Sequence, residues 1–412
     1  MPAPTLLVFE NALLLDGTGQ RPGHVLIEGE VIREVSDRPI ASPSARRIDL
    51  RGRTLMPGLI DAHVHVVATT AHLAQNALLP DALIAHRAAR IMREMLRRGF
   101  TTVRDMGGAT IGLRLAWEEG LIEGPRLILC GKALSQTGGH SDLRGRHDSR
   151  DAGWYAPRLG ALGRVVDGVD AIRRAAREEI KAGADFIKVM ANGGVASPTD
   201  PIAYLGFSRE ELCAAVEEAE NAGTYVAAHL YTDRAIRRAV ECGVRSLEHC
   251  NLITPETAGL AASRGAIACP TLITYQALAE EGAAFGLPPE SVAKIEDVRQ
   301  AGLGSLAIMR EAGLTMAFGT DLLGEMHRRQ GEEFLLRREV LPAMEVIRSA
   351  TCHAARLLCQ EGRIGCIAPG ALADLIVPEA DPLSDISVLA GNGERLLAVM
   401  QGGRFIHHRL EC

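Results

Sequence analysis

Two histidines placed two residues apart are the first sign of chemistry in this chain. His63 and His65 lie in LIDAHVHV (residues 59–66), whose other residues are typical of a buried strand. Because side chains along a strand alternate between its two faces, both imidazoles point to the same side. One imidazole in a core is usually satisfied by a neighbour, but two that point together indicate half of a binding site.

Further polar residues stand at or near the ends of later apolar runs. These are Lys188 in DFIKVM (185–190), His229 in TYVAAHL (224–230), His249 in SLEHCN (246–251) and Asp321 in TMAFGTD (315–321). Imidazole and carboxylate groups suit divalent transition metals, zinc first among them. A single catalytic ion uses three or four protein ligands. The four histidines and the aspartate exceed that need, so the set predicts more than one ion.

Lys188 is the unusual member of this set. A protonated amine would repel a metal ion, and burial lowers the pKa of a lysine. A neutral amine can instead take up carbon dioxide and become a carbamate, whose two oxygens can bridge two cations. Two ions about 3.5–4 Å apart can share a hydroxide and stabilise a developing oxyanion. The sequence therefore predicts a carboxylated lysine (N6-carboxylysine) at position 188 and two divalent ions, zinc first.

The elements that must position these residues alternate between short apolar runs and longer amphipathic stretches. Eight such runs occur: residues 59–66, 100–106, 126–132, 185–190, 224–230, 246–251, 266–272 and 315–321. Strand–helix alternation predicts a parallel sheet, and eight repeats predict an α/β fold of the (β/α)8 barrel type. The candidate residues would then meet at the carboxyl ends of the strands, where such barrels carry their active sites. Glycines end several of the helical stretches, at Gly99, Gly183, Gly223 and Gly313.

The two ends of the chain differ from its middle. Residues 1–56 and 360–412 are short apolar runs separated by Gly, Asn and Asp, which predict small antiparallel strands with tight turns. We expect the two ends to form one small β-sandwich domain, and residues 57–359 to form the metal-dependent barrel.

Composition excludes several classes of protein. The 412 residues are 47% hydrophobic and 23% charged, with a net charge of −6, so no basic face for nucleic acid is indicated. The nine cysteines lack a C-x-x-C pair, which argues against a disulfide framework and for a reducing compartment. We read no signal peptide and no membrane span near the N-terminus, and we expect a cytoplasmic protein that acts on a small molecule.

At this point the sequence resembles the amidohydrolase superfamily. MPGLIDAHVH (56–65) is similar to its first-strand signature, and FIKVM, AAHLY, SLEHCN and FGTD match its later ligands in order. GRIGCIAPGALADLIV (362–377) resembles the return of that family's chain into its terminal β domain. The resemblance implies that His63 and His65 bind the more buried ion with Asp321, that carboxylated Lys188 bridges both ions, and that His229 and His249 hold the second. It also implies that Asp321 carries a proton from the bridging water to the leaving amine.

Two further segments are similar to binuclear-zinc members that resemble prolidases and Xaa-Arg(Lys) dipeptidases. These are ALSQTGGHSD (133–142) and FIKVMANGGVASPTDP (186–201). The resemblance implies hydrolysis of the amide bond of dipeptides or N-acyl amino acids by a homo-oligomer. His140 would polarise the scissile carbonyl, and Tyr231 would contact the substrate α-carboxylate. Backbone N–H groups of Gly194 and Val195, in the glycine-rich loop, could also receive that carboxylate.

Several alternatives stay open from the sequence. One is an amidohydrolase of bulky N-acyl aromatic amino acids, such as ochratoxin-type amides. Another is a mononuclear enzyme of the deaminase or imidazolonepropionase type, and a third is a scaffold that has lost catalysis. The leaving amino acid is not encoded in any motif, although the irregular stretch 142–163 is expected to cover the site. We expect the remaining histidines of interest to lie on the surface or in loops: His72, His86, His327, His407 and His408.

Overall fold

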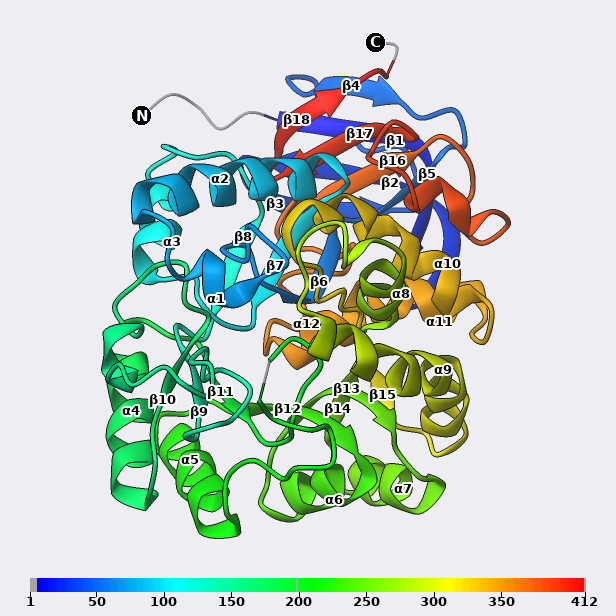
Figure 1. Cartoon of the computed structure of the whole chain (residues 1–412). Helices are drawn as coiled ribbons and strands as arrows, with labels where there is room; N and C mark the ends of the chain where they lie inside the picture. The colour runs from blue at the N-terminus through cyan, green and yellow to red at the C-terminus, as the bar shows by residue number, and fades with distance from the viewer. Residues whose placement is uncertain (1–5, 198, 411–412) are drawn as a thin grey trace.

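The computed structural model describes residues 6–197 and 199–410. Strands from both ends of the chain form one eight-stranded sheet, drawn in blue and red at the same end of the molecule in Figure 1. Its strands are β1 (Leu6–Asp16), β2 (Gly19–Glu28), β3 (Val31–Ser36), β4 (Arg46–Asp49), β5 (Thr54–Pro57), β16 (Leu375–Pro378), β17 (Leu396–Gln401) and β18 (Arg404–His408). The sheet has a buried core of its own, which includes Phe9, Ile48 and Leu375.

This terminal sheet is mixed, whereas the sequence predicts antiparallel strands. β1 pairs antiparallel with β2 but parallel with both β4 and β5. Parallel partners need a crossover connection, which here is supplied by the intervening strands rather than by a helix. β5 also pairs antiparallel with β16, and this pairing joins the two ends of the chain in one sheet.

The middle of the chain contains two parallel sheets. Each of the eight predicted runs contains a strand: β6 (Leu59–Val64), β7 (Phe100–Asp105), β8 (Arg126–Leu129), β11 (Ile187–Met190), β12 (Val226–Thr232), β13 (Ser246–Leu252), β14 (Ile267–Cys269) and β15 (Thr315–Met316). Backbone hydrogen bonds link the sheets at both junctions, from Ala62 N–H to the Phe318 carbonyl and from Asp185 N–H to the Leu129 carbonyl. The parallel strands therefore form a barrel-like core.

Two short strands were not predicted from the sequence. β9 (Ala133–Ser135) pairs parallel with β10 (Gly163–Val165) and contacts β11 at a single register position. Three-residue strands give no periodic pattern to detect. They matter because the segment between them, residues 136–162, carries His140 and runs over the end of the barrel.

Helices surround the parallel strands (Figure 1). They are α1 (Leu73–Asn76), α2 (Asp81–Arg97), α3 (Ile111–Glu118), α4 (Val169–Lys181), α5 (Arg209–Asn221), α6 (Asp233–Glu241), α7 (Pro255–Ser263), α8 (Leu272–Glu281), α9 (Pro289–Glu311), α10 (Glu333–Arg338), α11 (Ala343–Ser349) and α12 (Cys352–Leu357), with 3-10 turns η1 (Ala152–Trp154), η2 (Gly324–Glu332) and η3 (Ile386–Leu389). Among the described residues, no helix combines the length and apolar character needed to cross a bilayer.

Local sequence explains how these helices begin and end. Ser208 caps α5 and forms a capping box with Glu211, which satisfies backbone groups at the helix start. Buried residues of α2, among them Ile84, Ala88 and Ile91, recur at helical spacing and face the strands. The predicted glycine stops are confirmed at the end of α2 and elsewhere: Gly99, Gly183, Gly223 and Gly313 all have positive φ angles.

The eight cysteines within the described residues are all free.

Candidate active site

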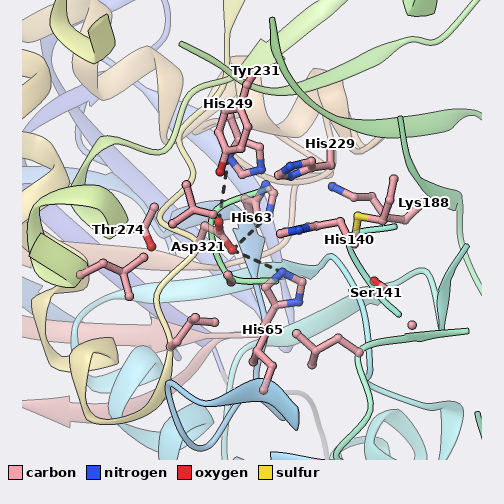
Figure 2. A pocket seen from close by; sticks show the side chains of 18 of the residues that line it. His63, His65, His140, Ser141, Lys188, His229, Tyr231, His249, Thr274 and Asp321 are labelled. Carbon is pink, nitrogen blue, oxygen red and sulfur yellow. Dashed lines mark ion pairs between the residues drawn. The ribbon is translucent and has the colours of Figure 1, made fainter. Parts of the chain in front are cut away.

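The six predicted metal ligands meet at one end of the parallel strands. They come from β6 and the residue after it, from β11, β12 and β13, and from the segment after β15: His63, His65, Lys188, His229, His249 and Asp321. All six line a single cavity, together with His140 and Tyr231. Figure 2 shows these side chains turned toward a common space. These residues are spread over more than 250 positions of the sequence. They share one cavity because parallel strands present their carboxyl ends at the same face.

Asp321 lies at the centre of the group. Its Oδ1 is 3.4 Å from His63 Nε2 and 3.3 Å from His65 Nε2, and its Oδ2 is 4.0 Å from His249 Nδ1. Burial alone would raise the pKa of this carboxyl, but the surrounding imidazoles hold it well below its usual range. Asp321 is therefore an ionised carboxylate that faces three imidazoles, as the dashed lines in Figure 2 mark.

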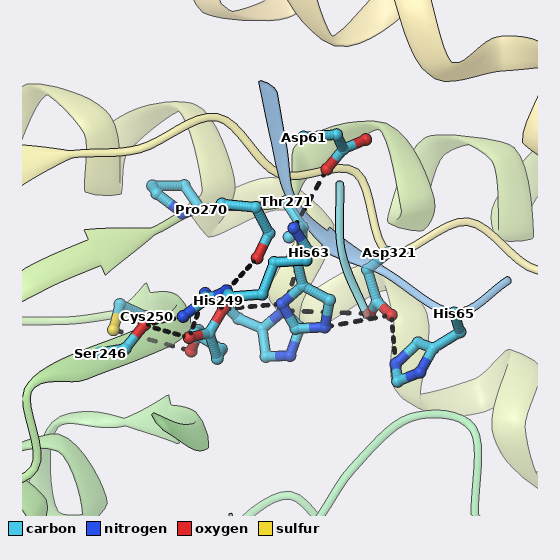
Figure 3. A network of polar contacts seen from close by, with 12 residues as sticks. Asp61, His63, His65, Ser246, His249, Cys250, Pro270, Thr271 and Asp321 are labelled. Carbon is cyan, nitrogen blue, oxygen red and sulfur yellow. Dashed lines mark hydrogen bonds and ion pairs between the residues drawn. The ribbon is translucent and has the colours of Figure 1, made fainter. Parts of the chain in front are cut away.

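Each of the four imidazoles has one ring nitrogen engaged by a neighbouring oxygen. The pairs are His63 Nδ1 with Glu248 Oε2 (2.8 Å), His65 Nδ1 with the Gly107 carbonyl (3.1 Å), His249 Nδ1 with Thr271 Oγ1 (2.7 Å) and His229 Nε2 with the Gly193 carbonyl (3.3 Å). Figure 3 shows the bond to Thr271 and the His63 and His65 contacts with Asp321. Metal-binding histidines are oriented in this way, with one nitrogen held and the other left for the ion.

Backbone strain is concentrated at the same place. His249, Cys250 and Asp321 have φ angles of 69°, 58° and 53°, a region that residues with side chains seldom adopt. Asp321 N–H also donates to the His63 carbonyl, which ties the end of the last strand to the first. Strained backbone of this kind persists where the surrounding structure holds it, and it occurs mainly at functional sites.

Lys188 is buried beside this group, with 1% of its surface exposed. Burial lowers the pKa of its amine, although the charges of Glu248 and Asp321 oppose the shift. In Figure 2 the amine points toward the imidazoles rather than away from the cavity. Four imidazoles, each with its second nitrogen on the cavity side, one carboxylate and one buried amine form a donor set that fits divalent metal ions.

The sequence pattern of the amidohydrolase family matches residues 54–405, which is most of the chain. The chain belongs to the amidohydrolase family. Among curated proteins it is similar to an ochratoxinase of Aspergillus niger, with 32% identity over 96% of this chain and 86% of that protein. The resemblance stated from sequence motifs is therefore confirmed.

Solved structures of amidohydrolases agree with this assignment. The crystal structure of a prolidase in complex with N-methylphosphonate-L-proline is 52% identical, covers 98% of this chain and 100% of its own, and superposes with a TM-score of 0.97. An Xaa-Pro dipeptidase with bound methionine is 32% identical over 98% of this chain and 100% of its own, with a TM-score of 0.87. The prolidase-like character inferred from the sequence is thus supported by both.

Tyr231 of this amidohydrolase lies inside the cavity, 4.7 Å from His229 between ring centroids. Its hydroxyl accepts a hydrogen bond of 3.0 Å from Tyr275, and the Val195 backbone N–H lies against the same oxygen. Burial raises the pKa of Tyr231, so the hydroxyl keeps its proton. That proton is available to an acceptor in the cavity. Tyr275 was missed in the sequence, because a tyrosine at a helix start carries no distinctive signal.

His140 stacks on His229, with ring centroids 4.3 Å apart. The Gly194 N–H, which we expected to face a substrate carboxylate, instead donates to Asp200 Oδ2 at 2.9 Å. Val195 keeps its place in the lining of the cavity. The stretch 142–163 also contributes to that lining through Leu143 and Leu162.

Sequence reasoning missed a buried charged network behind the ligands. Glu248 accepts two hydrogen bonds from Arg104, at 2.9 and 3.1 Å, and both side chains are fully buried. Arg104 pulls the pKa of Glu248 far below its usual range despite burial, so the residue that holds His63 is a carboxylate. The sequence did contain a signal for this pair. A charged residue inside a buried strand needs a partner of opposite charge, and β7 carries Arg104 while β13 carries Glu248.

The expectation for His327 was wrong. This histidine is not on the surface: it is 3% exposed in η2 and contacts the Ala68 carbonyl at 3.3 Å. Burial lowers its pKa to about 3, so it is neutral. Its sequence neighbours are polar, and for that reason the pattern gave no sign of burial.

Proposed function

We propose that this amidohydrolase cleaves the amide bond of N-acyl amino acids or dipeptides at a binuclear metal site. One observation carries the proposal: six side chains from five strand ends face one cavity, and each imidazole among them has one nitrogen held. The prolidase that is 52% identical supports the same reaction class. Zinc is the preferred metal because the donors are imidazole and carboxylate.

The residues that would hold the ions divide into two sets and a bridge. His63 and His65 with Asp321 would bind one ion, His229 and His249 the other, and Lys188, as the carbamate formed with carbon dioxide, would bridge them. Such an ion pair supplies a hydroxide nucleophile and polarises the scissile carbonyl when bound.

The chain's own side chains would handle the proton and the substrate. Asp321, an ionised carboxylate, accepts the proton of the nucleophile and passes it to the leaving nitrogen, as general acid–base catalysis requires. His140 stabilises the oxyanion that forms at the amide carbonyl. The Tyr231 hydroxyl donates a hydrogen bond to the α-carboxylate of the substrate. It can do so because its oxygen already accepts a hydrogen bond from Tyr275.

The lining of the cavity favours an uncharged leaving amino acid. Most of the wall is apolar, from Leu73, Leu143, Leu162, Met190, Val195, Leu278 and Leu323. Among the described residues of this lining, Asp321 is the only carboxylate, so an arginine or lysine side chain would find no counter-charge away from the metals. We therefore propose proline or an apolar residue as the leaving amino acid.

A second candidate is hydrolysis of bulky N-acyl aromatic amino acids. The Aspergillus niger relative is an ochratoxinase with 32% identity over nearly the whole chain. The apolar part of the cavity lining, which includes Leu143, Leu162 and Leu278, suits an aromatic acyl group or a phenylalanine leaving group.

A matched substrate series tests this proposal. Zinc-loaded enzyme would be given one acyl group joined to Pro, Phe, Arg or Lys, and the released amino acid measured. We expect release from the Pro and Phe substrates, and at least about tenfold slower release from the Arg and Lys substrates. Fastest release of Arg or Lys would contradict the substrate class, and no release from any substrate would contradict the hydrolysis itself.

Other features inferred from the sequence stay predictions. These are full closure of the strands as a (β/α)8 barrel, sandwich packing of the terminal sheet, the domain limits at residues 57 and 359, a homo-oligomer and a cytoplasmic location.

A further inference from the structure

A chain of polar contacts runs from His140 into the loop that follows β11. His140 Nδ1 lies 2.7 Å from Ser197 Oγ and 3.4 Å from Asp200 Oδ2. Ser197 Oγ also forms a hydrogen bond with Asp200 Oδ1. Both loop residues are only 1% exposed. These contacts therefore belong to the protein interior rather than to a solvated surface.

The donors and acceptors of this chain have one consistent assignment. Ser197 donates its single hydroxyl proton to Asp200 Oδ1. Ser197 Oγ must then accept from His140, whose Nδ1 therefore carries a proton. This leaves Nε2 as the ring nitrogen that can act on a substrate. Because a carbonyl oxygen is stabilised only by a donor, Nε2 must carry a proton as well, so His140 would act in its imidazolium form with Asp200, 3.4 Å away, as the counter-charge.

The loop that carries Ser197 and Asp200 is itself held from a distant helix. Lys294, in α9, donates to the carbonyls of Gly194, Ser197 and Asp200, each at 2.9 Å. Three backbone acceptors on one ammonium fix the course of the loop.

Gly194 adds a steric reason for this geometry. A Cβ placed on Gly194 would lie 1.9 Å from His140 Nδ1, so only glycine allows the ring to stand against the loop. The Gly194 N–H bond to Asp200 holds the glycine in that place. The loop is thus shaped around the imidazole.

We propose that Ser197 and Asp200 are positioning residues that hold His140 with Nε2 toward the scissile carbonyl, and that Lys294 holds the loop that carries them. The inference rests on the proposed hydrolysis, because His140 is assigned its role there. It predicts that Ser197 and Asp200 affect turnover through His140.

A double-mutant cycle tests this dependence. With an N-acyl-proline substrate and zinc-loaded enzyme, Ser197→Ala should lower kcat about tenfold and change KM less than about twofold. In a His140→Gln background the same change should have almost no further effect, because the group it positions is gone. Equal losses of kcat in both backgrounds would overturn the proposal.

Two variants separate positioning from folding. Ser197→Thr keeps the hydroxyl and should retain most of the wild-type kcat, whereas Ser197→Ala should not. Ser263→Ala, the same change at an exposed serine at the end of α7, serves as the matched control and should leave kcat unchanged. A Ser197→Thr variant as slow as Ser197→Ala, with unchanged metal content, would contradict the role of the hydroxyl.

A measurement without turnover distinguishes failure of this inference from failure of the proposed function. In ¹⁵N-histidine-labelled, zinc-loaded protein, the His140 signal is identified by its loss in His140→Gln. We expect a proton fixed on Nδ1 in the wild type, and loss of that fixed proton in Ser197→Ala. An unprotonated Nδ1 in the wild type would overturn the positioning role even if hydrolysis is observed. A protonated Nδ1 without hydrolysis of any substrate would overturn only the proposed function.

Discussion

The proposed metal side of the site and the proposed substrate side are built from different parts of the fold. On the metal side, His63, Lys188, His229 and His249 lie on strands, and their partners also come from strands or from residues directly after them. On the substrate side, Tyr231 also lies on a strand, β12, whereas His140, Val195 and the residues that hold them lie on loops. These loops are fixed by side chains from elsewhere, such as Lys294 of α9.

The comparison explains which residues could be recognised in the sequence. A strand fixes the direction of each side chain by alternation, and its carboxyl end fixes the face on which that side chain lies. A loop fixes neither, so the orientation of its residues depends on contacts that are distant in sequence. The predictions below test whether the two sides behave as differently as they are built.

Removal of metal should have the largest effect on hydrolysis, because all the candidate ligands on the strands would bind the metal ions. We expect chelation to abolish hydrolysis, and zinc to restore it with two ions per chain measured on purified protein. One ion per chain with full activity would instead favour the mononuclear alternative. A chain that binds no metal would favour a scaffold without catalysis.

Lys188→Ala tests the bridge between the two ions. Loss of the carbamate should lower kcat at least about 1000-fold, since several kcal/mol of transition-state stabilisation would be lost. Lys188→Glu restores a carboxylate at this position and should recover part of the metal content. Wild-type enzyme given ¹³C-bicarbonate should show a carbamate signal in its ¹³C NMR spectrum. Full turnover by metal-loaded Lys188→Ala would remove the carbamate from the account.

Glu248→Gln tests the buried support behind His63. The substitution should weaken metal affinity by about 10–100-fold, the usual cost of losing a residue that orients a ligand. It should also lower the free energy of unfolding by up to about 3 kcal/mol, because Arg104 loses its buried counter-charge. Glu218→Gln is the matched control: this glutamate is also buried and paired with arginines, but on α5. It should leave metal affinity unchanged, and equal metal loss in both variants would argue against a specific role.

Tyr231→Phe moves the test to the substrate side. Loss of one hydrogen bond to a charged group should raise KM roughly tenfold for substrates with a free α-carboxylate. Amidated versions of the same substrates, which lack that charge, should be affected much less. A similar rise in KM for both series would show that Tyr231 does not contact the carboxylate.

Lys294→Met should have the smallest effect of the series. The loop keeps its other contacts, including the Gly194 bond to Asp200, so we expect kcat to fall only about threefold while metal content stays constant. Limited proteolysis should show faster cleavage of the loop between residues 192 and 205. A variant with lost metal would indicate that the loop also supports the strand ends.

The sequence was sufficient to locate the candidate ligand residues and the eight strands that carry or neighbour them, but not the groups behind them. The eight apolar runs each contain a strand, and the polar candidate residues of five of them line the cavity. The Arg104–Glu248 pair and buried His327 were missed, since a charged or polar residue reveals its burial only through a partner. The parallel pairing of β1 with β4 and β5 was missed because short strands carry no mark of their direction.

By itself, the sequence determined which residue types stand at the ends of which strands, and hence the family and the chemistry of the metal donors. This was possible because strand periodicity is local and acts over a few residues. Only the tertiary structure decided which ring nitrogen each histidine presents, that the Gly194 N–H binds Asp200, that Ser197 contacts His140, and that Lys294 binds the loop that carries Ser197. Those choices depend on hydrogen-bond partners up to 185 residues apart in the chain, and no local pattern encodes such pairings.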